Sequence, residues 1–365
     1  MATYAEQIAD LEAQILKTQY NKATQHHIGL VKAKIAHLRE KAETRAKASG
    51  GPGDGYQVRK TGDGTVILLG FPSTGKSTVL NTLCGTESEV AAYAFTTLTC
   101  IPGMLNYKHA KIQILDVPGI VAGAATGRGR GKEVLAVMRN ADMCMFIVDV
   151  LRPNEFAVIR REAESVGIRF NTRRPDVKIK RTARGGIKIA KTCRLTMLDD
   201  ETIVGVLKEF RYNSADVIIR EDISVDQLID CIEDNKKYMP AITVFNKMDL
   251  VTTEQMAALE REYRPDIFIS AQRKENIEAL RQLIYDKLDL MSVYLKEPGK
   301  EADMNVPLIM FRTGTIRDLC EKLHKDFVTK FKFSRVWGKS AKFGGQKLML
   351  GHHLKDGDVV EIHVK

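Results

Sequence analysis

Short runs of apolar residues, separated by longer stretches with helical spacing, recur along the chain from about residue 60 onward. The run at residues 66–69 is wholly apolar, which is typical of a strand buried on both faces of a sheet. Similar segments lie at 112–115, 143–148 and 242–245. Because these strands alternate with helices, the pattern predicts an α/β fold with a parallel sheet.

The first 48 residues show helical periodicity. Apolar side chains fall on one helical face in two successive stretches, namely Ile8, Leu11 and Ile15, then Val31, Ile35 and Leu38. A turn at 21–24 with Thr24 as an N-cap separates them, so residues 1–48 are predicted to form a helical hairpin arm. The arm could serve for docking or dimerisation, or bind nucleic acid, and its charge does not separate the two. The glycine- and proline-rich stretch 49–60 is expected to be a flexible linker.

One interval between strands is too long for a simple crossover. About 90 residues separate the strand ending near residue 150 from the next one at 242, whereas a βαβ unit needs about 30. We therefore predict an insert at 169–236. Its first part alternates apolar and basic residues on both sides of Arg184-Gly185-Gly186, which predicts a basic β-hairpin, followed by helices at 199–210 and 224–235.

The predicted hairpin is strongly basic. Nine lysines and arginines lie between residues 173 and 194, against a single acid, Asp176. This density could mark a solvated charged face, or it could form a surface that contacts RNA phosphates.

The remaining segments complete the predicted organisation. Residues 61–168 and 237–292 would form the nucleotide-binding domain on either side of the insert. Residues 293–365 predict a small mixed β domain, with strands near 306–311 and 359–364 and an amphipathic helix at 315–328.

Composition narrows the class of protein. The 365 residues carry 56 Lys and Arg against 46 Asp and Glu, a formal charge of +10 that favours a polyanionic partner. No window has the roughly 18–20 apolar residues of a membrane span, and the start of the chain lacks a secretion signal, so a cytoplasmic protein without membrane contact is expected. The six cysteines are scattered singly, which predicts reduced thiols rather than a zinc or disulfide site.

The segment after the first strand carries a phosphate-binding signature. Gly70, Phe71, Pro72, Ser73, Thr74, Gly75, Lys76 and Ser77 match G-x-x-x-x-G-K-[ST], and Thr78 continues into a helical pattern. The glycines let backbone amides wrap a phosphate, and Lys76 adds a positive charge for the β- and γ-phosphates. The Ser77 hydroxyl is a hard oxygen ligand for Mg²⁺.

A second motif follows the next strand, and a candidate switch residue precedes it. Asp116, Val117, Pro118 and Gly119 form D-x-x-G, in which the carboxylate can hold Mg²⁺ through water and the Gly119 amide can sense the γ-phosphate. Ile120 stands where a glutamine could orient the attacking water, and an aliphatic side chain cannot do this, so slow hydrolysis of the nucleotide is expected. The pair Thr96-Thr97 lies between the two motifs and is a candidate for a mobile first switch.

The base is specified by two segments at the ends of later strands. In Asn246-Lys247-Met248-Asp249, the aspartate can accept hydrogen bonds from guanine N1–H and the N2 amino group, a donor pair that adenine lacks. Ser270 and Ala271 would bring a backbone amide toward guanine O6. Together these motifs make the chain resemble a translation-factor-class P-loop GTPase.

The resemblance extends to one branch of that class. The segments 70–73, 95–98 and 116–120 and the glycine-rich stretch 123–131 resemble Obg-like GTPases. Asn21-Lys22-Ala23-Thr24 with His26-His27, the stretch 88–93, and Val336-Trp337-Gly338 resemble the developmentally regulated GTP-binding (DRG) proteins. This resemblance implies an insert like domain 2 of ribosomal protein S5 and a C-terminal TGS domain with a β-grasp fold.

The same resemblance implies a mechanism and partners. Lys76, Thr97 and Gly119 would be the catalytic group, Ser77 and Thr97 the Mg²⁺ ligands, and GTP or GDP the bound nucleotide. Ser73 stands where potassium-activated relatives of the wider class carry an asparagine that ligates the cation. The DRG family keeps serine and is nonetheless described as potassium-responsive, so the resemblance implies K⁺ dependence as a hypothesis. Ribosomes or rRNA, and in a eukaryote a DRG-family regulatory protein, would be partners. The alternative function is an RNA-binding, ribosome-associated scaffold with GTP as a structural ligand.

Overall fold

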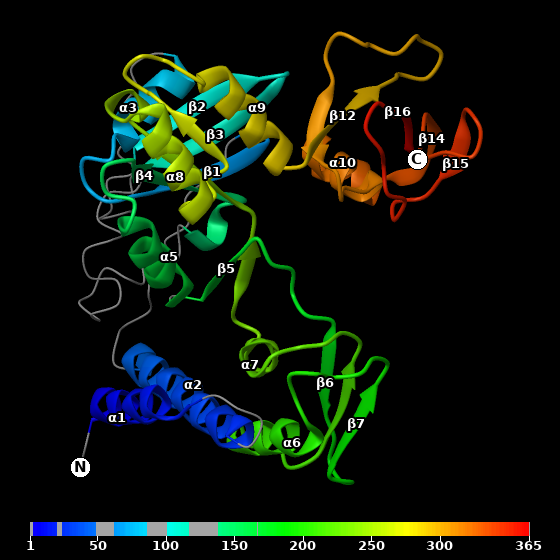
Figure 1. Cartoon of the computed structure of the whole chain (residues 1–365). Coiled ribbons are helices and arrows are strands. Elements are labelled where there is room, and N and C mark those ends of the chain that lie inside the picture. The colour runs from blue at the N-terminus through cyan, green and yellow to red at the C-terminus, as the bar shows by residue number, and fades with distance from the viewer. Residues whose placement is uncertain are drawn as a thin grey trace. The chain divides into compact units, whose positions relative to one another are not determined.

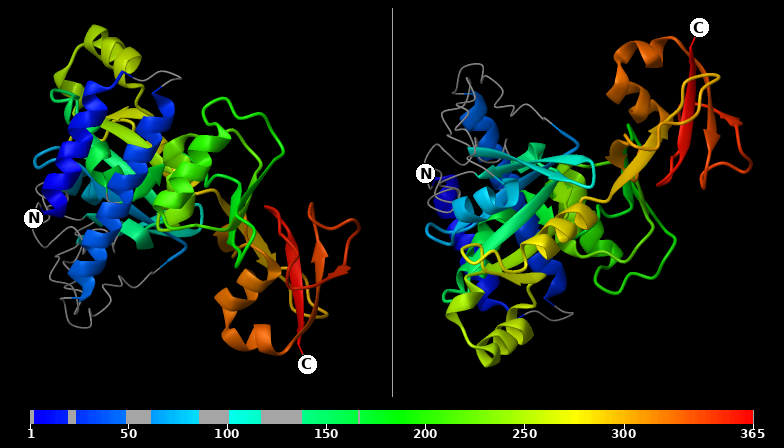
Figure 2. Two further views of the ribbon diagram at one scale, coloured as in Figure 1. Left: turned by 90° about the horizontal axis from the view of Figure 1, so that it is seen from below. Right: turned by 90° about the horizontal axis from the view of Figure 1, so that it is seen from above.

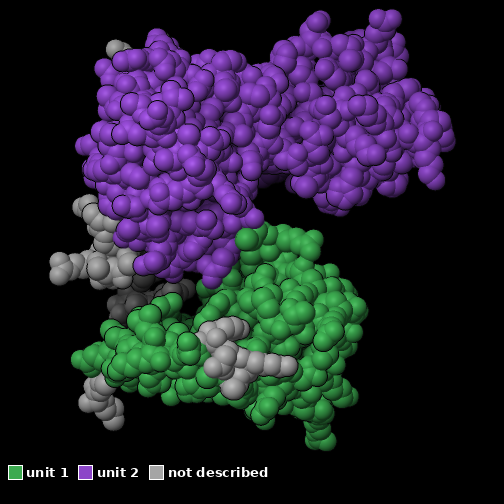
Figure 3. Space-filling model, viewed as in Figure 1, with its two compact units in different colours: residues 1–55, 172–238 green, residues 56–171, 239–365 purple. Residues whose placement is uncertain are grey.

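The computed structural model describes residues 3–19, 24–48, 62–85, 101–116, 138–165 and 167–364. It divides into two compact units that are coloured separately in Figure 3. Unit 1 comprises residues 1–55 and 172–238, and unit 2 comprises 56–171 and 239–365. Within the described ranges, no helix is long and apolar enough to span a bilayer.

Unit 2 is built on a sheet, called the large sheet here, whose described strands run in the order β11-β10-β4-β1-β3-β2. The strands are β1 (Gly64–Leu69), β2 (Ile101–Tyr107), β3 (Ala110–Asp116), β4 (Met143–Asp149), β10 (Ala241–Asn246) and β11 (Ile267–Ile269). All neighbours are parallel except β2, which runs antiparallel to β3 at the edge. The predicted parallel α/β sheet is thus confirmed, with an antiparallel strand added.

Helices cover both faces of the large sheet (Figure 1). They are α3 (Lys76–Cys84), α5 (Glu155–Ser165), α8 (Thr253–Tyr263) and α9 (Ile277–Lys287), with the short 3₁₀ turn η1 (Met248–Leu250). Successive residues of β1 face opposite sides. Leu68 packs in the core that includes α3 and α9, and Ile67 packs in the core that includes α5. This two-sided burial is the physical reason for the uninterrupted apolar run at 66–69.

The C-terminal part of unit 2 forms a second sheet, in the order β13-β12-β16-β14-β15. Its strands are β12 (Leu290–Leu295), β13 (Leu308–Phe311), β14 (Phe331–Trp337), β15 (Gln346–Leu348) and β16 (Val359–Val364). Helix α10 (Ile316–Leu323) packs Ile316, Leu319 and Cys320 into the core of this sheet, and α11 (Lys325–Thr329) follows it (Figure 2). The predicted small mixed β domain is confirmed.

Unit 1 contains the N-terminal helices and the insert. Its elements are α1 (Tyr4–Lys17), α2 (Gln25–Ala48), β6 (Val177–Arg181), β7 (Ile187–Lys191), α6 (Asp200–Glu209), β8 (Ala215–Ile219) and α7 (Val225–Glu233). Helices α1 and α2 lie side by side, as Figure 2 shows, and α2 begins immediately after Thr24. The predicted helices of the arm and the insert are all present. The short strands β5 (Ile168–Phe170) and β9 (Lys237–Met239) pair where the chain enters and leaves the insert.

The predicted basic β-hairpin is wrong. Strands β6 and β7 form where expected, but β8 lies between them, in a small sheet of order β6-β8-β7. β8 runs antiparallel to β6 and parallel to β7, so β7, α6 and β8 form a crossover unit. The connection at 182–186 runs past the start of β8 to join β6 to β7. There the Thr182 amide donates a hydrogen bond to the Ser214 carbonyl at 3.0 Å.

The charges explain why the apolar strand takes the centre of the small sheet. On the exposed face, register places Asp216 of β8 between Lys180 of β6 and Lys188 of β7. An acid thus separates two lysine-bearing strands, whereas like charges on directly paired strands repel. On the other face, β8 buries Val217 and Ile219 beneath the helices. The alternation along β6 and β7 predicted both strands but not their neighbour.

A further feature of unit 1 was not expected from the sequence: α2 completes the core of the insert. Ala33 of α2 is fully buried in the same cluster as Ile203 of α6 and Leu228 of α7. The helices approach closely at glycines, since a Cβ added at Gly29 would lie 2.9 Å from the Thr202 methyl group. Lys32 of α2 also pairs with Asp226 of α7 at 2.7 Å. The arm and the insert therefore fold as one unit.

Candidate nucleotide site

The loop between β1 and α3 adopts a conformation that only particular residues permit. Gly75 has φ +89°, and Ser73 has φ +66°. A Cβ at Gly75 would lie 2.4 Å from Nδ2 of Asn246, and one at Gly70 would lie 2.6 Å from the Ile147 carbonyl. Glycine is thus required at both ends of this loop, which leads into the N-terminus of α3.

Lys76, the first residue of α3, curls back over the loop. Its Nζ donates to the carbonyl of Gly70 at 3.0 Å and to that of Phe71 at 2.9 Å. Burial lowers the pKa of Lys76, and the nearby Asp116 carboxylate opposes that shift. The ammonium is therefore held at the mouth of the loop, where a phosphate would offer it a stronger partner.

Ser77, in the first turn of α3, and Asp116, at the carboxyl end of β3, form a polar pair. The Ser77 hydroxyl donates to Oδ2 of Asp116 at 3.1 Å. Asp116 is 4% exposed, and its buried Oδ1 has no hydrogen-bond partner among the described residues. Burial raises the pKa of Asp116, against the opposing effects of Lys76 and Ser77. A buried carboxylate oxygen beside a hydroxyl fits a hard divalent cation such as Mg²⁺.

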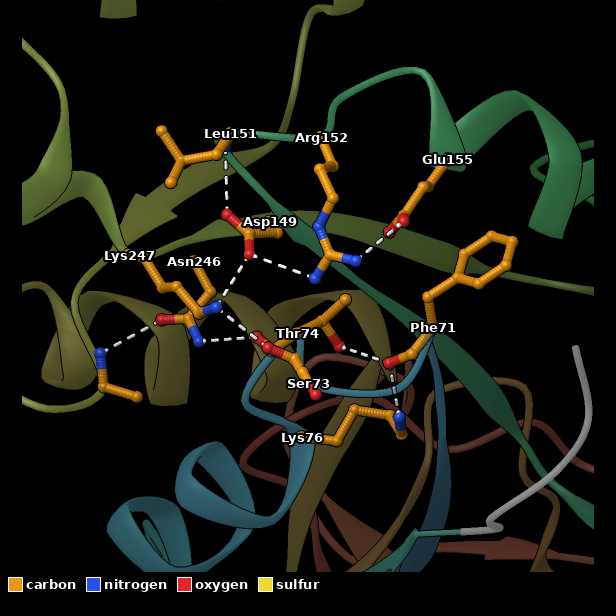
Figure 4. Close-up of polar contacts among 11 residues, drawn as sticks. Phe71, Ser73, Thr74, Lys76, Asp149, Leu151, Arg152, Glu155, Asn246 and Lys247 are labelled. Atoms are coloured by element: carbon orange, nitrogen blue, oxygen red, sulfur yellow. Dashed lines mark hydrogen bonds and ion pairs between the residues drawn. The ribbon is translucent and has the colours of Figure 1, made fainter.

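Asn246 connects three segments of the site. Its Nδ2 donates to the carbonyl of Thr74 at 2.9 Å, and its Oδ1 accepts from the amide of Ala271 at 3.1 Å. The end of β10 is thereby tied to the phosphate loop and to the segment after β11 (Figure 4). The Ala271 amide, expected to face guanine O6, donates within the protein in this structure.

Lys247 and Asp149 form an ion pair that sequence reasoning missed. Lys247 has φ +68°, and its Nζ donates to Oδ2 of Asp149 at 2.7 Å and to the Ser73 carbonyl at 2.8 Å. The side chain of Asp149 is 3% exposed. The available signal was an acid that ends the apolar run at 143–148, at the same sheet edge as the other motifs.

The base-side residues lie at the same edge. Asp249 is in η1, and its side chain is 10% exposed, with Oδ2 3.8 Å from Nε of Arg273. Ser270 is buried, and its hydroxyl accepts from the Arg273 amide at 3.1 Å. The structure thus brings Asn246, Lys247, Met248 and Asp249 together with Ser270 and Ala271. Thr96, Thr97, Val117, Pro118, Gly119 and Ile120 lie outside the described residues.

Comparison with known proteins assigns the fold and the family. A family model described as a 50S ribosome-binding GTPase matches residues 65–180, and one for the C-terminal region of that domain matches 184–290. A TGS domain model matches 291–364, the span of the C-terminal sheet. Developmentally-regulated GTP-binding protein 1 of Xenopus laevis is 42% identical over 97% of this chain and 97% of its own.

The chain belongs to the developmentally regulated GTP-binding (DRG) protein family. Developmentally-regulated G-protein 3 of Arabidopsis thaliana is 42% identical over 99% of both chains. An uncharacterized GTP-binding protein of Methanocaldococcus jannaschii, MJ1326, is 49% identical over 99% of this chain and 93% of that protein. The predicted DRG resemblance is confirmed, as are the P-loop GTPase and TGS domains. As a DRG protein, the chain is a GTP-binding protein with a GTPase domain.

Proposed function

We propose that this DRG protein is a slow GTPase that acts as a nucleotide-controlled switch on the translation machinery and contacts RNA through unit 1. The observation that carries the proposal is the link, through Asn246, between the phosphate loop and the base-side loop. Because this link ties the two loops together, a nucleoside phosphate that spans both would be held at its two ends.

The base would be read by Asp249. Its carboxylate can accept from guanine N1–H and the N2 amino group, and a site built around that pair leaves the carboxylate unpaired when adenine enters. The partly buried Asp249 satisfies the requirement for a desolvated acceptor. GTP and GDP are therefore the expected ligands.

Hydrolysis would depend on Mg²⁺ and on residues around the γ-phosphate. Ser77 would hold the ion directly and Asp116 through water, and Thr97 would add a ligand when the first switch closes. Mg²⁺ supplies charge neutralisation of the phosphates. Ile120 cannot orient water, so we expect unaided turnover on the order of 10⁻⁴ to 10⁻² s⁻¹. K⁺ stimulation would appear as faster hydrolysis in K⁺ than in Na⁺ buffer.

The RNA-binding surface would be the exposed face of the small sheet. Lys178, Lys180 and Lys188 project from this face, and all three are exposed. The family model matched at 65–180 is described as ribosome-binding, which supports ribosomal RNA as the polyanion. Arg181 is a weaker candidate, because its guanidinium stacks on Tyr212, with Cζ 4.0 Å from the ring centroid.

Binding of the protein to purified ribosomes at several salt concentrations tests the proposal. We expect charge reversal of Lys178, Lys180 and Lys188 to glutamate to weaken binding and to flatten the salt dependence by about one unit of log–log slope per lysine. The matched control reverses Arg160, Arg161 and Arg261, which are exposed on helices of unit 2. An unchanged salt slope in the lysine variant would reject this surface.

The alternative, a scaffold with GTP as a structural ligand, makes a different prediction for Lys76→Ala. A switch needs the triphosphate, so this variant should lose nucleotide-dependent ribosome association. Full association, together with rescue of cells that lack the protein, would favour the scaffold.

A further inference from the structure

The ion pair between Lys247 and Asp149 joins a residue of a nucleotide-binding motif to an acid that lies outside all of these motifs. Asp149 ends β4, and register places it directly beside Asn246 at the end of β10. Its carboxylate is almost completely buried, at 3% exposure, whereas the Lys247 side chain is 31% exposed. Burying a carboxylate at the nucleotide-binding edge of the sheet costs free energy unless a cation and hydrogen-bond donors compensate its charge.

The hydrogen bonds that Asp149 accepts show what compensates this charge. Oδ1 of Asp149 accepts from the Leu151 amide at 3.0 Å, which fixes the carboxylate plane. Oδ2 accepts from Lys247 Nζ at 2.7 Å and from Arg152 Nη2 at 3.4 Å. Burial opposes ionisation of Asp149, but the hydrogen bonds from Lys247 and Leu151 outweigh it, so that its pKa is lowered. The carboxylate is therefore a fixed anion.

Lys247 occupies the centre of this arrangement. Figure 4 shows its ammonium between Asp149 and the phosphate loop, where it also donates to the Ser73 carbonyl at 2.8 Å. Both Lys247 and Ser73 have positive φ, a conformation that costs a non-glycine residue free energy and that neighbouring contacts must maintain. Two residues after Lys247 lies Asp249, the residue proposed to read the base.

We propose that Asp149 is a positioning residue for guanine nucleotides: it anchors Lys247, and through Lys247 it holds the turn that presents Asp249 to the base. Without the anchor, the lysine side chain and the turn gain freedom, and Asp249 meets guanine less often in the bound geometry. The inference rests on the proposed recognition of guanine by Asp249.

Release of a fluorescent GDP analogue tests the role of Asp149. We expect Asp149→Asn to accelerate release about 10- to 100-fold, because a charged hydrogen bond that holds the base side is weakened. Competition by inorganic tripolyphosphate, which needs only the phosphate loop, should change less than about twofold. Equal losses for GDP and tripolyphosphate would indicate a general structural defect and overturn the proposal.

The matched control is Asp142→Asn, at the other end of the same strand. Asp142 precedes β4 and accepts from the Thr65 amide at 3.0 Å, at the sheet edge remote from the nucleotide. It should leave GDP release unchanged. If Asp149→Asn does not fold, as judged by its melting temperature, Asp149→Glu keeps the charge but moves it by one methylene, and it should still accelerate GDP release.

Two further variants separate this inference from the proposed function. Because Asp149 acts through Lys247, the double variant Asp149→Asn/Lys247→Met should release GDP no faster than Lys247→Met alone; additive effects would overturn the proposal. Asp249→Asn should shift preference from guanine toward xanthine, whose 2-oxo group accepts a hydrogen bond. If guanine preference survives that change, the proposed recognition of the base fails. If Asp249→Asn shifts the preference toward xanthine but the Asp149 variants release GDP like the original protein, the proposed recognition of the base stands and the positioning role is wrong.

Discussion

The large sheet of unit 2 and the small sheet of unit 1 carry their functional polar side chains in different positions. In the large sheet, every residue of β1 and β4 is buried, so functional side chains occur only where the strands end. In the small sheet, β6 and β7 alternate partly buried and exposed residues, and Lys178, Lys180 and Lys188 stand on an open face. A site at strand ends can select one molecule because side chains tie its loops together, whereas a face of cations offers charge to any polyanion of suitable shape.

The effect on nucleotide binding should be largest for a substitution inside the phosphate loop, which Asn246 links to the base-side loop. We expect Gly75→Ala to weaken GDP binding about 100- to 1000-fold, because the new methyl group meets Nδ2 of Asn246 at 2.4 Å and φ is +89°. Titration calorimetry with GDP measures the loss. The matched control is Gly85→Ala at the other end of α3, where φ is +82° but nothing lies within 4 Å. Equal losses in both variants would mean that backbone strain, and not the contact with Asn246, is responsible.

A change in the core of unit 1 should act on stability instead. We expect Ala33→Glu to destabilise unit 1 by about 2–3 kcal/mol, since it buries a charge in the cluster shared by α2, α6 and α7. Hydrogen exchange should rise in α6 and α7, although the substitution lies on α2. Lys34→Glu, at the exposed neighbouring position, should leave exchange unchanged. GDP affinity should be the same in all three proteins, and a loss with Ala33→Glu would show that the two units are coupled.

The smallest effect is expected at a helix start. Asp199 caps α6 by accepting from the Thr202 amide at 2.7 Å, and hydrogen bonds from the Thr202 side chain and amide lower its pKa. Asp199→Ala should cost about 1 kcal/mol of unit 1 stability at neutral pH. Because the pKa is lower in the folded state, this contribution is present above the unfolded value of about 3.9 and is lost as pH falls through the folded pKa.

Guanidinium denaturation of the original protein and of Asp199→Ala at neutral and acidic pH measures this effect. The difference between them should close as the carboxylate is protonated. Glu201→Ala, on the exposed side of the first turn, is the control. If the difference in unfolding free energy between the two proteins persists in acid, the destabilisation by Asp199→Ala comes from lost packing and not from the charged cap.

The two sheets also differ in how far the sequence predicts them. The parallel strands of the large sheet were predictable because each is an apolar run, and all except β4 are followed by a polar motif; the carboxyl ends of parallel strands meet at one edge. The antiparallel edge strand β2 has no such motif and was not expected. Asp149 was overlooked because a single acid after an apolar run has no spacing that distinguishes it. Its role is visible only when β4 and β10 lie side by side and bring it to Lys247.

In unit 1, the sequence predicted elements but not their neighbours. The alternation in β6 and β7 gives strands, and the glycines at 185 and 186 favour a turn, but neither feature shows that β8 is inserted between the two. The packing of α2 on α6 was hidden for a similar reason. Helix α2 meets the insert at Gly29 and Ala33, which lie outside the predicted apolar stripe of Val31, Ile35 and Leu38.

The composition of unit 1 from two distant segments has a consequence during synthesis. Helix α2 ends at residue 48, and its partner α6 begins at residue 200, so about 150 residues separate them. At roughly 5–20 residues per second, the ribosome needs about 8–30 s to make the intervening chain. Throughout that interval Ala33 of the nascent α2 lacks the insert residues with which it forms a core, and chaperones have this time window in which to shield that face of the helix.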